Sequence, residues 1–100
     1  MNITKENLIN LAQDNGFISI LPMSAVINDV KYYNLWLSEL QAALRDGKLY
    51  DKWIVQVVQQ EGEYFAQYKF PTKEYRYTSM FEFYEDALQE GLIKTLKIWT

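Results

Sequence analysis

Along the first half of the chain, hydrophobic positions recur at helical spacing, which predicts two helices before any strand. The first runs from about Lys5 to Asp14, with Thr4 placed to cap its start and Gly16 placed to adopt the left-handed conformation after its end. Its apolar stripe consists of Leu8, Leu11 and Ala12. The apolar run Phe17–Leu21, which ends at Pro22, is predicted to be an extended connector or a short edge strand.

The second predicted helix is the longest element and runs from about Met23 to Asp46, closed by Gly47. Its apolar stripe steps by fours and threes and consists of Val26, Val30, Tyr33, Leu37, Leu40 and Leu44. The stripe is widened on one side by Ala25, Tyr32, Trp36 and Ala43. At about 100° per residue the apolar arc spans roughly 160°, which is more than one sheet covers. The Trp36 side therefore requires a second neighbour, either the first helix or another chain.

The middle of the chain has the alternation and turn residues of an antiparallel meander. Two strands, Trp53–Gln60 and Glu63–Phe70, flank the turn Glu61-Gly62, where Gly62 can adopt a positive φ. Pairing across this turn sets like residues opposite each other: Val58 and Phe65, Val57 and Ala66, Gln56 and Gln67, Val55 and Tyr68. A second turn, Pro71-Thr72-Lys73-Glu74, leads into a third strand from Tyr75 to about Met80.

This register predicts one core face and one half-wet face of the sheet. The core face would carry Trp53, Val55, Val57, Tyr64, Ala66, Tyr68, Phe70, Tyr75 and Tyr77. The second face would carry Gln56, Gln67, Lys69, Arg76 and Thr78 together with Ile54, Val58, Phe65 and Met80. Val58, Phe65 and Met80 then lie side by side, and we predict that either Phe17–Leu21 or another chain covers them.

The last predicted helix begins between Met80 and Tyr84 and reaches Ile98, with Ser79 and Glu82 at the spacing of a capping box. Its inner stripe consists of Tyr84, Leu88, Gly91, Leu92, Thr95 and Trp99. Ala87 and Gly91, one turn apart, would let its backbone approach the sheet closely. The sequence thus predicts a single α+β domain over residues 1–100, with two N-terminal helices, a three-stranded antiparallel meander and a C-terminal helix packed on one sheet face.

Composition argues against catalysis. The 100 residues include no Cys and no His, which removes disulfides, thiolate nucleophiles, imidazole bases and most transition-metal sites. The acidic residues Glu82, Glu85, Asp86 and Glu90 suit the start of a helix, where the dipole favours negative charge. Glu61 and Glu63 flank an exposed hairpin tip, where neither burial nor a partner would equip them as an acid–base pair. We predict no enzymatic activity, no catalytic residue, no metal, no cofactor and no small-molecule ligand.

Net charge and hydropathy limit the classes of partner that the chain is expected to bind. The net charge of −3 disfavours a phosphate-binding surface. Lys69, Lys73 and Arg76 alternate with tyrosines, and the order helix, three strands, helix is that of double-stranded-RNA-binding domains, yet our register separates these basic and aromatic side chains onto opposite faces. The chain lacks the pattern of a signal peptide or a membrane span, so we expect a cytoplasmic protein without membrane contact.

Several segments resemble a group of short gut-bacterial proteins that are often associated with phages or transposons. They are Thr4–Leu8, Gly16–Ser19, Leu21–Val26, Lys31–Leu37, Glu39–Gln41, Tyr84–Leu88 and Gly91-Leu92. This resemblance implies a mobile-element origin and no particular activity. The closing helix after a three-stranded meander also resembles that of HicB-like antitoxin domains, although Phe83 stands where those domains usually have Ser or Thr and two helices precede the meander here.

The function that follows is a non-enzymatic interaction protein, acting by self-association as a homodimer or by binding one protein partner. The candidate interface residues are Tyr32, Trp36, Val58, Phe65 and Met80. For Tyr32 and Trp36, packing against the first helix is the competing interpretation. The alternative functions are a nucleic-acid-binding module that uses the meander, a HicB-like antitoxin-type regulator and, with least support, a small carboxylate-dependent enzyme.

Overall fold

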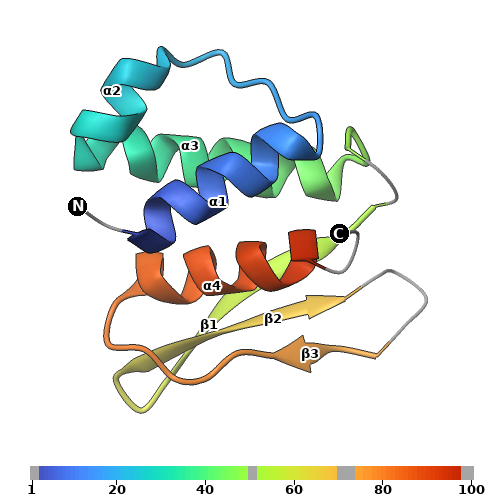
Figure 1. Cartoon of the computed structure of the whole chain (residues 1–100). Coiled ribbons are helices and arrows are strands. Elements are labelled where there is room, and N and C mark those ends of the chain that lie inside the picture. Colours follow the sequence, from blue (N-terminus) through green and yellow to red (C-terminus); the bar gives the residue numbers. More distant parts are fainter. Residues whose placement is uncertain (1–2, 50–51, 70–73, 98–100) are drawn as a thin grey trace.

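The computed structural model describes residues 3–49, 52–69 and 74–97, which form four helices and one three-stranded sheet (Figure 1). The predicted α+β fold is confirmed, with the C-terminal helix lying against the sheet. The helices are α1 (Ile3–Asp14), α2 (Met23–Asn28), α3 (Val30–Arg45) and α4 (Tyr84–Lys97). The strands are β1 (Ile54–Gln60), β2 (Glu63–Lys69) and β3 (Arg76–Tyr77).

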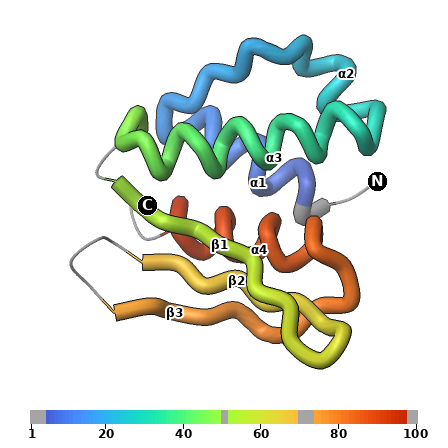
Figure 2. The backbone as a smooth tube through the Cα atoms, turned by 180° about the vertical axis from the view of Figure 1, so that it is seen from behind, coloured from blue at the N-terminus to red at the C-terminus, as the bar shows by residue number. Residues whose placement is uncertain are grey.

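The sheet has the simple order β1-β2-β3, with every neighbouring pair antiparallel. Helix α4 lies across β1 and β2, α3 contacts both β1 and α4, and α1 packs on α4 (Figures 1 and 2). The two opposite views agree that all four described helices lie on the same side of the sheet. No described element packs on the other side, so within the described residues the sheet has one covered and one open face.

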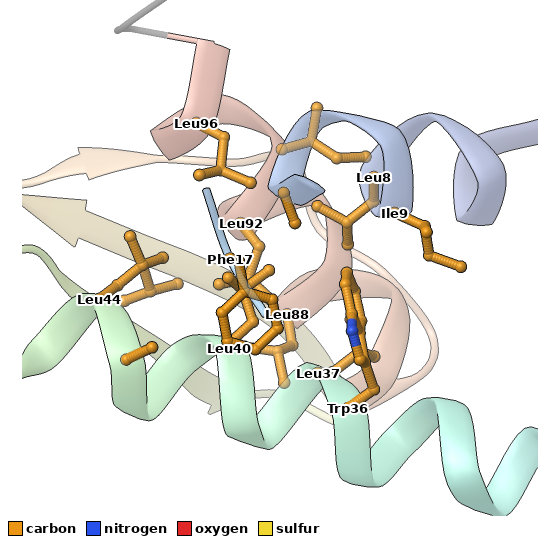
Figure 3. Packing of buried hydrophobic residues seen from close by; sticks show 14 of the residues in the cluster. Leu8, Ile9, Phe17, Trp36, Leu37, Leu40, Leu44, Leu88, Leu92 and Leu96 are labelled. Atoms are coloured by element: carbon orange, nitrogen blue, oxygen red, sulfur yellow. The ribbon is translucent and has the colours of Figure 1, made fainter. Parts of the chain in front are cut away.

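The core fills the space between the helices and the covered face (Figure 3). Leu8, Leu40 and Leu92 are fully buried, and Trp36 is only 1% exposed. Phe17 enters this core from the connector, and its ring meets Trp36 edge to face at 5.7 Å between centroids. Buried apolar surface stabilises at roughly 25 cal/mol per Å², so these large side chains dominate the stability of the fold. Helix α1 and Phe17 thus cover the Trp36 side from within the same chain.

The close approach of α4 to the sheet depends on Gly91. A Cβ atom at this position would lie 2.7 Å from Ala66 Cβ and 3.1 Å from Val55 Cγ1. The first distance is shorter than real carbon contacts, and Ala66 Cβ cannot move without its strand. Ala87, one turn earlier, is fully buried. The predicted close packing through Ala87 and Gly91 is therefore confirmed.

Both long helices before the sheet end as their glycines predict. Gly16 (φ 89°) follows α1 and Gly47 (φ 73°) follows α3. In each case the residue after the glycine donates its N–H back to the helix: Phe17 to Ala12 O at 2.9 Å, and Lys48 to Ala43 O at 2.9 Å. The start of α1 was predicted less well, because this helix already includes Thr4. Helix α4 begins at Tyr84, the last residue of the predicted range and beyond the Ser79–Glu82 capping-box spacing.

The long helix predicted over Met23–Asp46 is broken at Asp29, which corrects the sequence interpretation. Asp29 has extended backbone angles (φ −131°, ψ 121°), and its Oδ1 accepts a hydrogen bond from the Lys31 N–H at 2.8 Å. It therefore ends α2 and caps α3, as an aspartate does at a helix start. Val30 thus becomes the first residue of α3, and it is 73% exposed although it was predicted to be inward.

The first hairpin has the predicted register, with Val58 opposite Phe65 and Val55 opposite Tyr68. Its two-residue turn has a positive φ at both Glu61 (52°) and Gly62 (82°), which is the geometry that matches the twist of antiparallel strands. The third strand differs from the prediction. It is only two residues long, and it pairs Tyr77 with Gln67 and Arg76 with Tyr68.

Candidate functional site

The most distinctive surface is the uncovered side of the sheet, which we call the open face. It is defined by alternate residues of the three strands and their flanks: Ile54, Gln56, Val58, Phe65, Gln67, Lys69, Tyr75, Tyr77 and Met80. Helix α4 occupies the opposite face, so these side chains meet none of the described helices. The register places these side chains in three rows across the sheet. The first row contains Lys69 and Tyr75, the second contains the two glutamines and Tyr77, and the third contains the apolar residues Val58, Phe65 and Met80.

Three contacts within the open face hold its side chains in place. Gln67 Nε2 donates to Gln56 Oε1 at 3.0 Å across the β1–β2 pair. The rings of Phe65 and Tyr77 pack at 5.9 Å between centroids. Lys69 Nζ lies 4.5 Å from the centroid of the Tyr75 ring, which is cation–π geometry. Aromatic and amide groups therefore form a continuous and partly ordered surface.

The position of Tyr75 and Tyr77 corrects the sequence interpretation, which placed both on the core face. The predicted register carried the alternation of β2 straight through the second turn, and the observed pairing differs by one residue. Tyr77 is consequently 59% exposed on the open face, while Arg76 shares the face of buried Tyr68.

A bulge follows the third strand and restores the pairing at Phe81. Thr78 Oγ1 accepts the Ala66 N–H at 2.9 Å, and Tyr64 and Phe81 then exchange backbone hydrogen bonds of 2.7 and 2.6 Å. Between Tyr77 and Phe81 the chain has one residue more than β2 has between Gln67 and Tyr64, which is a β-bulge. Because Phe81 pairs with Tyr64 of the core face, alternation places Met80 on the open face.

The predicted apolar cluster of Val58, Phe65 and Met80 is brought to one face, but it is not covered by the N-terminal segment. Val58 and Phe65 are half-buried and Met80 is 42% exposed. Phe17 points into the helical core instead, and Ile18 is 89% exposed. The position of Phe17–Leu21 therefore excludes this segment as the cover of the apolar cluster. That another chain covers the cluster stays a prediction.

The two helical interface candidates have different positions. Trp36 is part of the core, between Phe17 and the stacked ring of Tyr33 at 5.9 Å, so its assignment to an interface was wrong. The wide apolar arc that suggested it is satisfied by α1 and the connector. Tyr32, which directly precedes Tyr33 in α3, is 39% exposed and lies on the surface. It lies in the helical layer, away from the open face.

The connector between α1 and α2 is held by Glu39, a role that the sequence interpretation missed. The Glu39 carboxylate accepts hydrogen bonds from the Ser19 hydroxyl and from the Ile20 N–H, the latter at 3.1 Å. Ser19 Oγ in turn accepts the Leu21 N–H at 2.9 Å. The connector is therefore an ordered arch rather than the alternative edge strand, and Ile20 points outward with 91% of its surface exposed.

Tyr33 and Gln89 form the principal buried polar contact between α3 and α4. The Tyr33 hydroxyl donates to Gln89 Oε1, and both side chains are buried. Burial, with a smaller contribution from the Asp86 carboxylate, raises the pKa of Tyr33 well above its usual range. Lys5 Nζ lies 4.6 Å from the centroid of the Tyr33 ring and donates to Ile27 O at 2.7 Å. A surface groove of about 420 Å³ opens here, and within it the Tyr33 hydroxyl and the Gln89 side chain bind each other.

Residues with catalytic or metal-binding chemistry are dispersed over the described surface. Within residues 3–49, 52–69 and 74–97, no three acidic side chains gather in a metal-binding group. Glu90 Oε1 lies 3.7 Å from Lys94 Nζ, an ion pair between residues one helical turn apart. Glu61 and Glu63 are exposed at the hairpin tip. Among the described helices, none has the length and apolar character needed to cross a membrane.

Comparison with protein-family models, with curated proteins and with solved structures finds no match to this chain. The resemblance to gut-bacterial proteins and to HicB-like antitoxin domains stays a prediction. The functional argument therefore rests on the geometry of the open face.

Proposed function

We propose that this chain is a non-enzymatic interaction protein that binds a protein surface, its own or that of one partner, through the open face. The observation that carries the proposal is the one-sided arrangement of the fold: every described helix lies on the same side of the sheet, and the other side presents Val58, Phe65, Tyr77 and Met80. Antiparallel sheets often have one wet face, but such faces are usually polar. Here apolar and aromatic side chains occupy neighbouring strands, which is typical of a binding surface.

The face, rather than the edge of the sheet, is the part available for binding. On the outer edge of β1, Gln41 Nε2 of α3 donates to Val55 O at 2.6 Å and occupies an acceptor that an added strand would need. On the other edge, β3 is two residues long and is followed by the bulge, which interrupts a regular ladder. Both edges are therefore poor templates for strand addition. A reducing, cytoplasmic setting fits the absence of cysteine and forms part of the proposal.

Paired affinity purifications test the proposal. A tagged chain is expressed beside an untagged copy, and nuclease-treated extracts are compared for the wild type, Phe65→Lys and the control Ile20→Lys. Both substitutions place a lysine at an apolar residue, but Ile20 lies on the connector, outside the open face. We expect a protein, either the untagged copy or one partner, to be retained by the wild type and the control and lost with Phe65→Lys. Identical retention by all three chains would refute the proposal.

A second candidate function is binding of single-stranded nucleic acid on the same face. It is favoured by the observed register, which brings Tyr75 and Tyr77 together with Lys69 instead of separating them. Exposed aromatic rings on a sheet with a nearby cation are the elements on which bases stack. The net charge of −3 opposes it, because phosphate contacts supply most of the affinity for nucleic acids. We therefore rank it below protein binding.

A further inference from the structure

We infer that the open face binds a second copy of this chain, face to face, about a two-fold axis that runs across the strands. In this arrangement the hairpin end of each sheet meets the opposite end of the other. The inference rests on the proposed function and adds to it the identity of the partner and the direction in which the two sheets lie.

The first argument is the distribution of charge along the strands. Beside the β1–β2 hairpin lie the exposed carboxylates of Glu61, Glu63 and Glu82, and residues 59–64 and 79–83 include no Lys or Arg. The far end of the open face carries Lys52 and Lys69, whereas Arg76 and, by alternation, Glu74 belong to the covered side. The described face is thus negative at one end and positive at the other.

The separation of the two ends makes this polarity effective. Glu63 and Lys69 are the first and last residues of β2, six positions apart along one face. At about 3.3 Å per residue their Cα atoms lie roughly 20 Å apart, or about two Debye lengths at physiological salt. Each end therefore interacts mainly with whatever charge is placed directly opposite it.

Symmetry then selects one arrangement. When two sheets face each other about an axis parallel to the strands, Glu63 lies opposite Glu63 and Lys69 opposite Lys69, which is repulsive at both ends. An axis perpendicular to the strands reverses one sheet, so that each Glu63 meets the partner's Lys69. The same rotation lays the row of Val58 and Phe65 over the partner's row of Gln67 and Tyr77. Electrostatic complementarity of this kind sets the register of an interface.

The area of the face predicts how strong this dimer is. Three strands about 4.8 Å apart and seven residues long cover roughly 300 Å² in projection. This is well below the roughly 800 Å² that each partner buries in a standard interface. We therefore expect a weak dimer, with a dissociation constant on the order of 10⁻⁵ to 10⁻⁴ M, which salt weakens further.

The test is sedimentation velocity from about 5 to 500 µM at low and at high salt. The wild type should pass from monomer to dimer in this range, and Phe65→Lys should remain monomeric with its circular dichroism unchanged. Glu63→Lys and Lys69→Glu should each raise the dissociation constant about tenfold or more, because each makes two contacts repulsive. Glu85→Lys, an exposed change of equal charge on α4, is the matched control and should leave the dimer unchanged.

Mixing the two charge variants gives the sharpest result. In the proposed arrangement a Glu63→Lys chain and a Lys69→Glu chain form two attractive contacts with each other, although each repels its own kind. The equimolar mixture should therefore dimerise about as well as the wild type. With the axis parallel to the strands, the single variants would be no weaker than the wild type.

Three results would overturn the inference. They are a wild type that stays monomeric at about 500 µM and low salt, charge variants that behave like Glu85→Lys, and a mixture that stays monomeric. A monomer whose open face still retains a different protein in the affinity experiment would refute the second copy and leave the proposed function standing. A monomer that binds an oligothymidine probe, and loses it with Phe65→Lys, would assign the face to nucleic acid.

Discussion

The two faces of the sheet are built from adjacent residues of the same strands but have opposite environments. On the covered face, Val55 and Ala66 pack so closely under α4 that only a glycine fits at position 91. On the open face, their neighbours Phe65 and Gln67 contact Tyr77 and Gln56 of the adjacent strands. The covered side of the strands is the more apolar, but the open side also carries Val58, Phe65 and Tyr77. What differs is that α4 is complementary to one face alone.

This difference separates two uses of apolar surface. Burial of the covered face is complete within the chain and contributes to the stability of the fold. The open face carries large apolar residues that none of the described helices covers, which is the observation behind the proposed association. Substitutions should therefore affect stability on one side and binding on the other, and the following experiments test this division.

Among the substitutions that leave the chain able to fold, Gly91→Ala should have the largest effect on stability. Its new methyl group would lie 2.7 Å from Ala66 Cβ, and relieving this clash requires α4 or β2 to shift. Overpacking of this kind costs up to about 3 kcal/mol, or a melting temperature lower by more than about 10 °C in a domain of this size. Urea denaturation measures the cost, with Glu85→Ala on the exposed side of α4 as the control. A loss below about 1 kcal/mol would mean that α4 is not held against the sheet as described.

Tyr33→Phe should have an intermediate effect that depends on pH. It removes the donor to the buried Gln89 oxygen, which costs about 1–2 kcal/mol at neutral pH. Because the folded-state pKa of Tyr33 is raised, the wild type keeps this stability below about pH 10 and loses it as the pH rises further. The difference in the free energy of unfolding should therefore narrow between about pH 10 and 11.5. A difference that stays constant with pH would contradict the buried, protonated hydroxyl.

Phe65→Lys should cost less than about 1 kcal/mol, because the lysine can reach solvent from the half-buried position on the open face. Tyr68→Lys, three positions along the same strand, places a charge in the core and should prevent stable folding. Thermal unfolding followed by circular dichroism compares the two. If Phe65→Lys destabilised the chain as severely as Tyr68→Lys does, the open face would be part of the core and the contrast between the faces would be lost.

The smallest effect is expected when nucleic acid is added, because we predict that the chain does not bind it tightly. We expect no dissociation constant below about 10⁻⁷ M for single-stranded or duplex probes at physiological salt, since the chain carries a net charge of −3. Fluorescence anisotropy provides the measurement, with Tyr77→Ala as the variant in which stacking would be lost. Tighter binding that disappears in this variant would make the open face a nucleic-acid platform.

Elements defined by short-range interactions could be predicted from the sequence. The glycines at 16 and 47 end their helices because only a residue without a Cβ adopts the left-handed conformation at low cost. The two-residue turn Glu61-Gly62 leaves a single way to pair β1 with β2, so that register was predicted correctly. The spacing of Ala87 and Gly91 similarly indicated where α4 approaches the sheet.

The tertiary structure decided those features for which the local sequence allows more than one conformation or register. The apolar stripe continues past Asp29, yet the helix breaks at this residue, whose side chain caps the start of α3. The register of β3 follows from its longer turn and from the bulge, which residues 76–81 alone do not specify. Phe17 and Ile18 are equally apolar, and only the space beside Trp36 determines that Phe17 is buried. For β3 and for Phe17, the deciding contacts join residues far apart in the chain, so no pattern of neighbouring residues could contain them.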